Sequence, residues 1–187
     1  MTDVFIFHGT EGYPEENWFP WLKQELEQVG CRVCVPQFPS PPVVPAQISD
    51  WFEVLRNYQQ YVHSETILIG HSLGGKFALR VLEQLQHPIK AACFVGTPIG
   101  VPPIVNNERD NAFTDNEFDW DMIKKKAQYV AVFQSDNDPY VGLDNGKELA
   151  KNLGVELSFI PSAGHFNTKA GYTTFPELLT KVLKIIK

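Results

Sequence analysis

The chain has 187 residues, of which 43% are hydrophobic and 20% charged, which is typical of one folded domain spanning residues 1–187. Its net charge of −6 and pI of about 5.3 lack the positive surface expected of a nucleic-acid-binding protein. No apolar run approaches the ~18 residues that cross a bilayer, and the N-terminus lacks the basic stretch of a signal peptide. We therefore expect a cytoplasmic protein with neither a membrane nor a nucleic-acid partner.

Six short apolar runs, rich in β-branched and aromatic residues, predict β-strands. Several of them are continuously apolar instead of alternating, as in parallel sheets whose two faces are both covered. The runs are Val4–Phe7, Arg32–Val35, Thr66–Ile69, Ala92–Val95, Tyr129–Phe133 and Glu156–Ile160.

Segments with helical periodicity separate these runs. Asp50 and Glu53 resemble a capping box at the start of one helix, and Leu178 and Val182 fall on one face of a C-terminal helix. The alternation of strands and helices predicts an α/β fold: a three-layer α/β/α sandwich with a mostly parallel sheet of about six strands.

Two long proline-containing stretches, 36–47 and 96–120, interrupt the alternation. Loops of this length in a compact domain usually have a function. The second stretch predicts a small cap or loop over residues 97–121.

The three cysteines do not form a disulfide framework. Cys31 and Cys34 form a C-x-x-C pair, but they lie on an expected strand, where residues three apart point to opposite faces. No second Cys/His pair follows at zinc spacing. We therefore expect no metal site and no cofactor.

The pattern Gly70-His71-Ser72-Leu73-Gly74 matches G-x-S-x-G, the nucleophile elbow, between an expected strand and an expected helix. Such a turn holds the serine in a strained conformation and leaves no room for side chains two residues to either side, which explains Gly70 and Gly74. The helix that follows directs backbone N–H groups toward a developing anion. The N–H of Leu73 is therefore one expected oxyanion donor.

A serine nucleophile needs a histidine base, which follows it in the chain in this type of fold. Only His87 and His165 follow Ser72, and His87 lies at an expected helix end. His165 comes directly after the last expected strand, at the sheet edge that carries Ser72. His63 has no evident partner and is expected on the surface.

An acid must orient that histidine. The run Tyr129–Phe133 leads into "QSDNDPYVG", where Asp136 and Asp138 are both candidates. Their positions alone do not separate them.

Four segments together carry a family resemblance: "HGTEGYPEENWFPWL", "GHSLGG", "DNDPYV" and "AGHFN". In this order and in a chain this short, they resemble the small serine hydrolase family that includes retinoblastoma-binding protein 9 and its bacterial relatives. The resemblance covers nearly the whole chain and implies a minimal α/β-hydrolase fold. It implies a catalytic triad of Ser72, Asp138 and His165, because the family's acid directly precedes a proline. It also implies a second oxyanion donor at the N–H of Thr10 or Glu11.

The leading hypothesis is a carboxylesterase-like serine hydrolase that cleaves a small ester or amide through an acyl-enzyme. One alternative is a weakly catalytic or non-catalytic protein-binding member on a hydrolase scaffold, although the retinoblastoma-binding motif L-x-C-x-E is absent. Acyl transfer to an alcohol would use the same residues, and a protein partner stays open. Candidate substrate-binding residues are Glu11, Trp18, His71 and Phe166.

Overall fold

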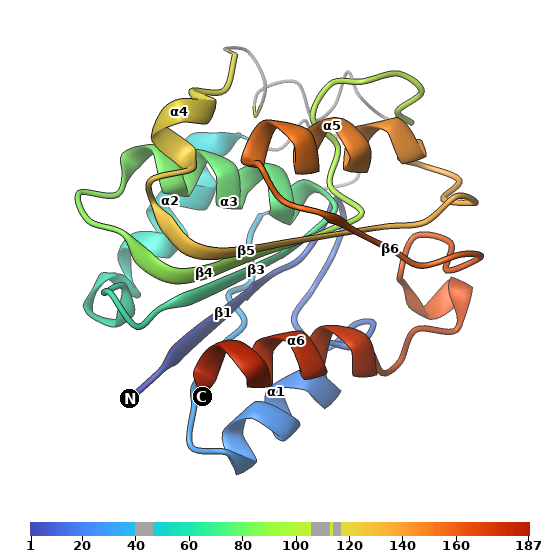
Figure 1. Ribbon diagram of the computed structural model, residues 1–187. Coiled ribbons are helices and arrows are strands. Elements are labelled where there is room, and N and C mark those ends of the chain that lie inside the picture. Colours follow the sequence, from blue (N-terminus) through green and yellow to red (C-terminus); the bar gives the residue numbers. More distant parts are fainter. Residues whose placement is uncertain (40–46, 106–112, 114–116) are drawn as a thin grey trace.

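The computed structural model describes residues 1–39, 47–105, 113 and 117–187. Its centre is a six-stranded sheet in the order β2-β1-β3-β4-β5-β6, and every neighbouring pair of strands is parallel (Figure 1). The predicted fold class is therefore confirmed, with an all-parallel sheet. The strands are β1 (Asp3–Phe7), β2 (Arg32–Cys34), β3 (Ile67–His71), β4 (Ile89–Val95), β5 (Ala127–Gln134) and β6 (Leu157–Phe159).

Helices cover both faces of this sheet. In Figure 1, α1 and α6 lie on one face and α2, α3, α4 and α5 on the other. Single turns of 3₁₀ helix occupy Gln59–Tyr61 and Thr168–Ala170. The α-helices are α1 (Phe19–Gln28), α2 (Ile48–Arg56), α3 (Leu73–Gln84), α4 (Trp120–Ile123), α5 (Leu143–Leu153) and α6 (Pro176–Ile186).

The central strands are apolar throughout because each face of the sheet has its own core. In β1, Val4 and Ile6 pack with α1 and α6, whereas Phe5 and Phe7 pack with α2 and α3. All residues of β1 and β3 are buried. Side chains alternate across a strand, so a strand covered on both sides must be apolar at every position.

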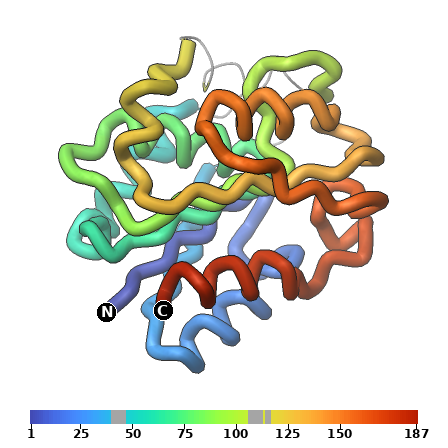
Figure 2. The backbone as a smooth tube through the Cα atoms, in the orientation of Figure 1, coloured from blue at the N-terminus to red at the C-terminus, as the bar shows by residue number. Residues whose placement is uncertain are grey.

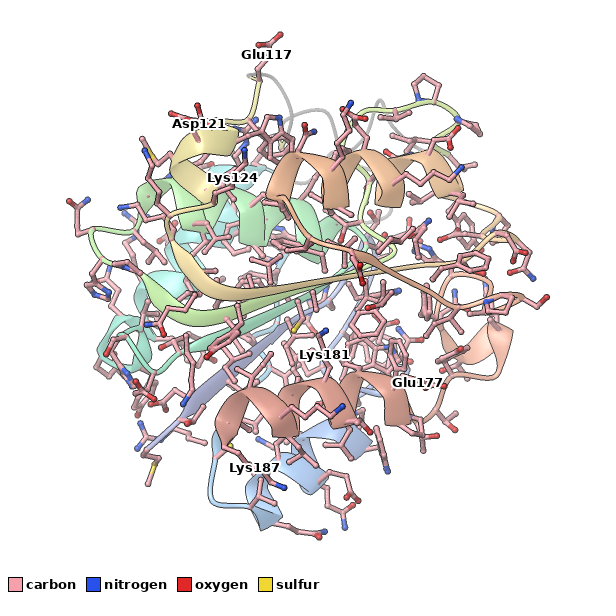
Figure 3. The ribbon with its side chains drawn as sticks, viewed as in Figure 1. Glu117, Asp121, Lys124, Glu177, Lys181 and Lys187 are labelled. Carbon is pink, nitrogen blue, oxygen red and sulfur yellow. The ribbon has the colours of Figure 1, made fainter. Side chains whose placement is uncertain are left out.

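The helices are amphipathic, as their periodicity predicts. On α6, Leu178 and Val182 are buried, whereas Glu177 and Lys181 are exposed along the helix (Figure 3). One predicted helix start is wrong, however. α2 begins at Ile48 after the N-cap residue Gln47, so Asp50 lies inside the first turn and does not cap the helix.

All six strands point the same way, so the loops that follow them gather at one edge of the sheet. Figure 2 shows both chain termini at the opposite end. Part of the cap expected over 97–121 lies outside the described residues, at 106–112 and 114–116. Its first part reaches the loop after β5, where Val105 N donates to Tyr140 O (2.9 Å). Among the described residues, no helix is both long and apolar enough to cross a membrane.

Candidate active site

Ser72 occupies a strained turn between β3, which ends at His71, and α3, which begins at Leu73. Its φ of 54° and ψ of −122° lie outside the regions that non-glycine residues favour, at a cost of about 1–3 kcal/mol. The backbone N–H of Ser72 donates to Val95 O on β4 (2.9 Å), which ties the turn to the neighbouring strand. The strained serine predicted from G-x-S-x-G is confirmed.

Glycines surround this serine because the backbone passes too close for side chains. A Cβ at Gly70 would lie 2.5 Å from Gly74 O, and a Cβ at Gly74 would meet the carbonyl oxygens of Phe7 and His8. The predicted steric reason for both glycines is confirmed. Sequence reasoning missed Gly9, where a Cβ would lie 2.9 Å from the Cβ of Ser72.

His165 and Asp138 are paired at the same edge of the sheet. His165 Nδ1 donates to Asp138 Oδ2 at 2.7 Å, and the two side chains are 8% and 0% exposed. The other carboxylate oxygen, Oδ1, accepts from the backbone N–H groups of Tyr140 (2.8 Å) and Val141 (3.0 Å). Because Nδ1 carries the proton, His165 Nε2 is left with a lone pair that can accept a proton.

The other acid candidate, Asp136, belongs to a clasp formed by three consecutive side chains. The Oδ1 atoms of Asp136 and Asn137 accept from the N–H groups of residues 162 and 164 (2.8 and 2.7 Å). Ser135 Oγ accepts from the N–H of residue 163 (2.9 Å). Side chains after β5 therefore hold the backbone that leads to His165. The polar run "SDND" after a strand is the sequence signal that could have revealed this clasp.

Two further side chains, those of His71 and Trp18, donate hydrogen bonds to the backbone of the loop that carries His165. His71 Nε2 donates to His165 O (2.8 Å), and Trp18 Nε1 donates to Phe166 O (2.9 Å). Burial and the nearby His165 imidazole lower the pKa of His71 to about 3, so its ring stays neutral. Trp18 and Phe166, expected at the substrate pocket, are fully buried in the core, where their aromatic rings pack around Phe175.

The loop after β1 also lies close to Ser72. His8 orients this loop: its Nδ1 donates to Gly9 O (2.8 Å) and its Nε2 accepts from Phe38 N (2.9 Å). Burial lowers the pKa of His8, which keeps this ring neutral as well. Thr10 and Glu11, the two candidates for the second oxyanion donor, both line the pocket that contains Ser72.

Ser72 and His165 open into one pocket of about 410 Å³. Its apolar wall, the apolar lining residues from the loops after β4 and β5, consists of Pro98, Ile104, Val105 and Val141. The remaining lining residues are mainly polar and make up its polar wall. Its members come from the loop after β1 and from the loop after His165, and they include Glu11, Tyr13, Glu16, Asn17, Asn167, Thr168 and Lys169.

The three thiols are all free. Cys31 directly precedes β2 and Cys34 is its last residue, and burial raises the pKa of each, which disfavours the reactive thiolate. Within the described part of the chain, no three His, Cys, Asp or Glu side chains come together as a metal ion would require.

Comparison with known proteins identifies the family to which this architecture belongs. The family profile described as "Serine hydrolase" matches residues 4–184. The chain belongs to the serine hydrolase family. The parallel sheet and flanking helices of this chain are therefore those of a small α/β hydrolase.

Individual relatives agree with that assignment. The chain is 31% identical over 173 residues to the putative hydrolase YdeN of Bacillus subtilis, covering 92% of this chain and 90% of that protein. The crystal structure of the ydeN gene product superposes with a TM-score of 0.91, covering 99% of this chain and 98% of that one. Serine hydrolase RBBP9 of Rattus norvegicus is 27% identical over 191 residues, covering 99% and 96%. A structure of Est1E from Butyrivibrio proteoclasticus with bound ferulic acid shares the fold, at a TM-score of 0.72 and 16% identity over 98% of this chain and 87% of that one.

The clasp generates a prediction about Asn137. Asn137→Ala removes the acceptor for the residue 164 N–H, so His165 loses part of its alignment and kcat for ester hydrolysis is expected to fall about tenfold. KM should change little, because Asn137 does not line the pocket. The matched variant Asn137→Asp keeps the Oδ1 acceptor and is expected to retain most of kcat. Equal losses in both variants, or a loss of thermal stability without a change in kcat, would contradict a positioning role.

Proposed function

We propose that this protein hydrolyses small esters or amides through an acyl-enzyme, with Ser72 as nucleophile, His165 as general base and Asp138 as the orienting acid. One observation carries the proposal. The hydrogen bond from His165 Nδ1 to buried Asp138 Oδ2 leaves the base with a free Nε2 in the pocket that also contains strained Ser72. Membership of the serine hydrolase family supports the same reaction class.

The reaction follows from these positions. Ser72 Oγ attacks the carbonyl carbon of the substrate while His165 Nε2 takes its proton, and Asp138 stabilises the imidazolium that forms. When the tetrahedral intermediate collapses, His165 gives that proton to the departing alcohol or amine, leaving Ser72 acylated. Water then attacks the acyl-enzyme with His165 again as base, which releases the acid and restores the Ser72 hydroxyl.

Backbone N–H groups would stabilise the negative oxygen of the intermediate. Leu73 is the first residue of α3, where the N–H groups of a helix are not used by its own hydrogen bonds. Thr10 lines the pocket that contains Ser72, on the loop that Gly9 brings close to that serine. Each such donor is typically worth about 3 kcal/mol of the barrier.

The nucleophile assignment is tested by labelling. Wild-type protein is expected to react with a fluorophosphonate at one serine, and Ser72→Ala should lose both this labelling and ester hydrolysis while its circular dichroism spectrum is unchanged. Ser158→Ala, in the distant strand β6, is the matched control and should label normally. Undiminished labelling of Ser72→Ala would remove Ser72 as the nucleophile.

The acid assignment is tested by a pair of isosteric changes. Asp138→Asn removes the charge beside His165 Nδ1 and is expected to lower kcat by a factor on the order of 10⁴. Asp136→Asn should cost little, because an amide oxygen can still accept from Ser162 N. Steady-state rates on one activated ester compare the two variants, and the reverse order would move the acid to Asp136.

Chain-length preference is tested with p-nitrophenyl esters. The pocket is small and its apolar wall short, so methylenes beyond the first few remain in water and gain little of the ~0.8 kcal/mol of full burial. We expect kcat/KM to be highest at about two to four acyl carbons and to fall by the octanoate. A rise from butyrate to decanoate would instead reveal a deep acyl pocket.

A further inference from the structure

Glu16 is a carboxyl group in the catalytic pocket that the proposed mechanism does not use. It lies on the loop between β1 and α1 and lines the same pocket as Ser72 and His165. The loop closes tightly around it, because Gly12 is buried and a Cβ there would meet Glu16 Oε1. The carboxylate accepts from the backbone N–H of Tyr13, and Glu16 N donates to Tyr13 O (3.3 Å). The carboxyl group is therefore held in place at the pocket wall.

The polar and apolar walls of this pocket belong to different loops, which are anchored by different hydrogen bonds. On the polar side, Thr168 N donates to Asn17 Oδ1 (2.9 Å), which joins the loop after β1 to the loop after His165. On the apolar side, Asn145 Oδ1 accepts from the N–H groups of Ile99 (2.9 Å) and Val101 (3.2 Å), which anchors the segment that carries Ile104. A substrate that fills the pocket would therefore meet apolar groups from the loops after β4 and β5 as well as carboxyl groups from the loop after β1.

The polar wall has an excess of acidic groups. Two carboxyl groups, those of Glu11 and Glu16, and one lysine, Lys169, are among the residues that line the pocket. Glu11 and Lys169 are exposed, whereas Glu16 is partly buried. Solvent weakens the interactions of exposed charges, so Glu16 has the strongest effect on a charged group that enters the pocket.

We propose that Glu16 is a specificity-determining residue that binds a positive charge on the alcohol or amine portion of the substrate, while a short acyl group packs against the apolar wall. This assignment rests on the proposed hydrolase function. The charge is assigned to the leaving group because an acyl chain of a few carbons is too short to fill both walls. The substrate class is thus a short-chain ester or amide of a cationic alcohol or amine.

The ionisation of Glu16 makes this preference depend on pH. Burial raises the pKa of Glu16 to about 7, although the hydrogen bond from the Tyr13 N–H and the nearby His165 oppose that shift. A carboxyl with a raised pKa is neutral below that value and charged above it, so the preference for a cation should be present above pH 7 and disappear as the pH falls through it. The other titratable or charged groups that line the pocket are Glu11, Tyr13, His71, Tyr140, His165 and Lys169.

The test compares acetylcholine with its uncharged isostere, 3,3-dimethylbutyl acetate, from pH 5.5 to 8.5. Both esters have the same acyl group and use the same catalytic residues, so the ratio of their kcat/KM values cancels any effect of pH that the two reactions share. For wild-type protein this ratio is expected to reach about ten above pH 7.5, the preference that about 1.4 kcal/mol would give, and to fall toward one at pH 5.5. Acetate release measured by NMR gives both rates.

Two variants separate Glu16 from the other charged groups. Glu16→Gln should give a ratio that no longer depends on pH, whereas Glu11→Gln should retain the transition near pH 7. A pH-independent ratio near one in the wild type, with the neutral ester turned over, would overturn the charge preference and leave the hydrolase function intact. A transition that survives in Glu16→Gln would overturn the role of Glu16. Failure to turn over either ester would overturn the proposed function and the charge preference together.

Discussion

The hydrogen bond between His165 and Asp138 depends on holding two loops from different strands in register. Three backbone N–H groups at residues 162–164 point at the side chains of residues 135–137, and the fourth side chain of that run, Asp138, reaches the imidazole. Each hydrogen bond contributes only about 0.5–1.5 kcal/mol, but an unpaired buried N–H would cost more. The clasp therefore provides hydrogen-bond partners for a loop backbone that has no sheet partners, and the same contacts position His165, the proposed base.

Ser72, the proposed nucleophile, is positioned at the same edge of the sheet by a different constraint, which is close backbone packing. Ser72 can sit at its strained turn because Gly9, Gly70 and Gly74 let β1, β3 and α3 approach without side chains between them. His71 connects the turn at Ser72 with the loop that carries His165. It directly precedes the serine, and its ring donates to the carbonyl of His165. A shift of the elbow would therefore also shift the loop that carries His165.

The sequence was most informative where local rules decide the structure. Strand positions and the turn at Ser72 follow from side-chain alternation and from glycine sterics, which act over a few residues. Long-range partners were not predictable in this way. His63, expected without a partner, pairs with buried Asp3 at 2.6 Å. Trp18 can be buried in the core because its indole N–H donates to Phe166 O. The sequence around Glu16 also contains no pattern that would indicate a functional residue, because its carboxyl group becomes buried near His165 only when the loop folds.

Burial disfavours the charged form of every group around this pocket, so it shifts the pKa values of the histidines and of Glu16 in opposite directions. It lowers the pKa of His71 and His8, so both rings near the elbow remain uncharged, and it raises the pKa of Glu16 into the neutral range. In the proposed mechanism, neutral rings near the elbow add no positive charge that would disfavour an imidazolium on His165. Glu16, in contrast, can become charged when a cation arrives, because the ion pair then offsets the desolvation that disfavours its ionised form. The loops that hold Ser72 and His165 thereby also hold Glu16, the carboxyl group that we propose binds a cation in the pocket.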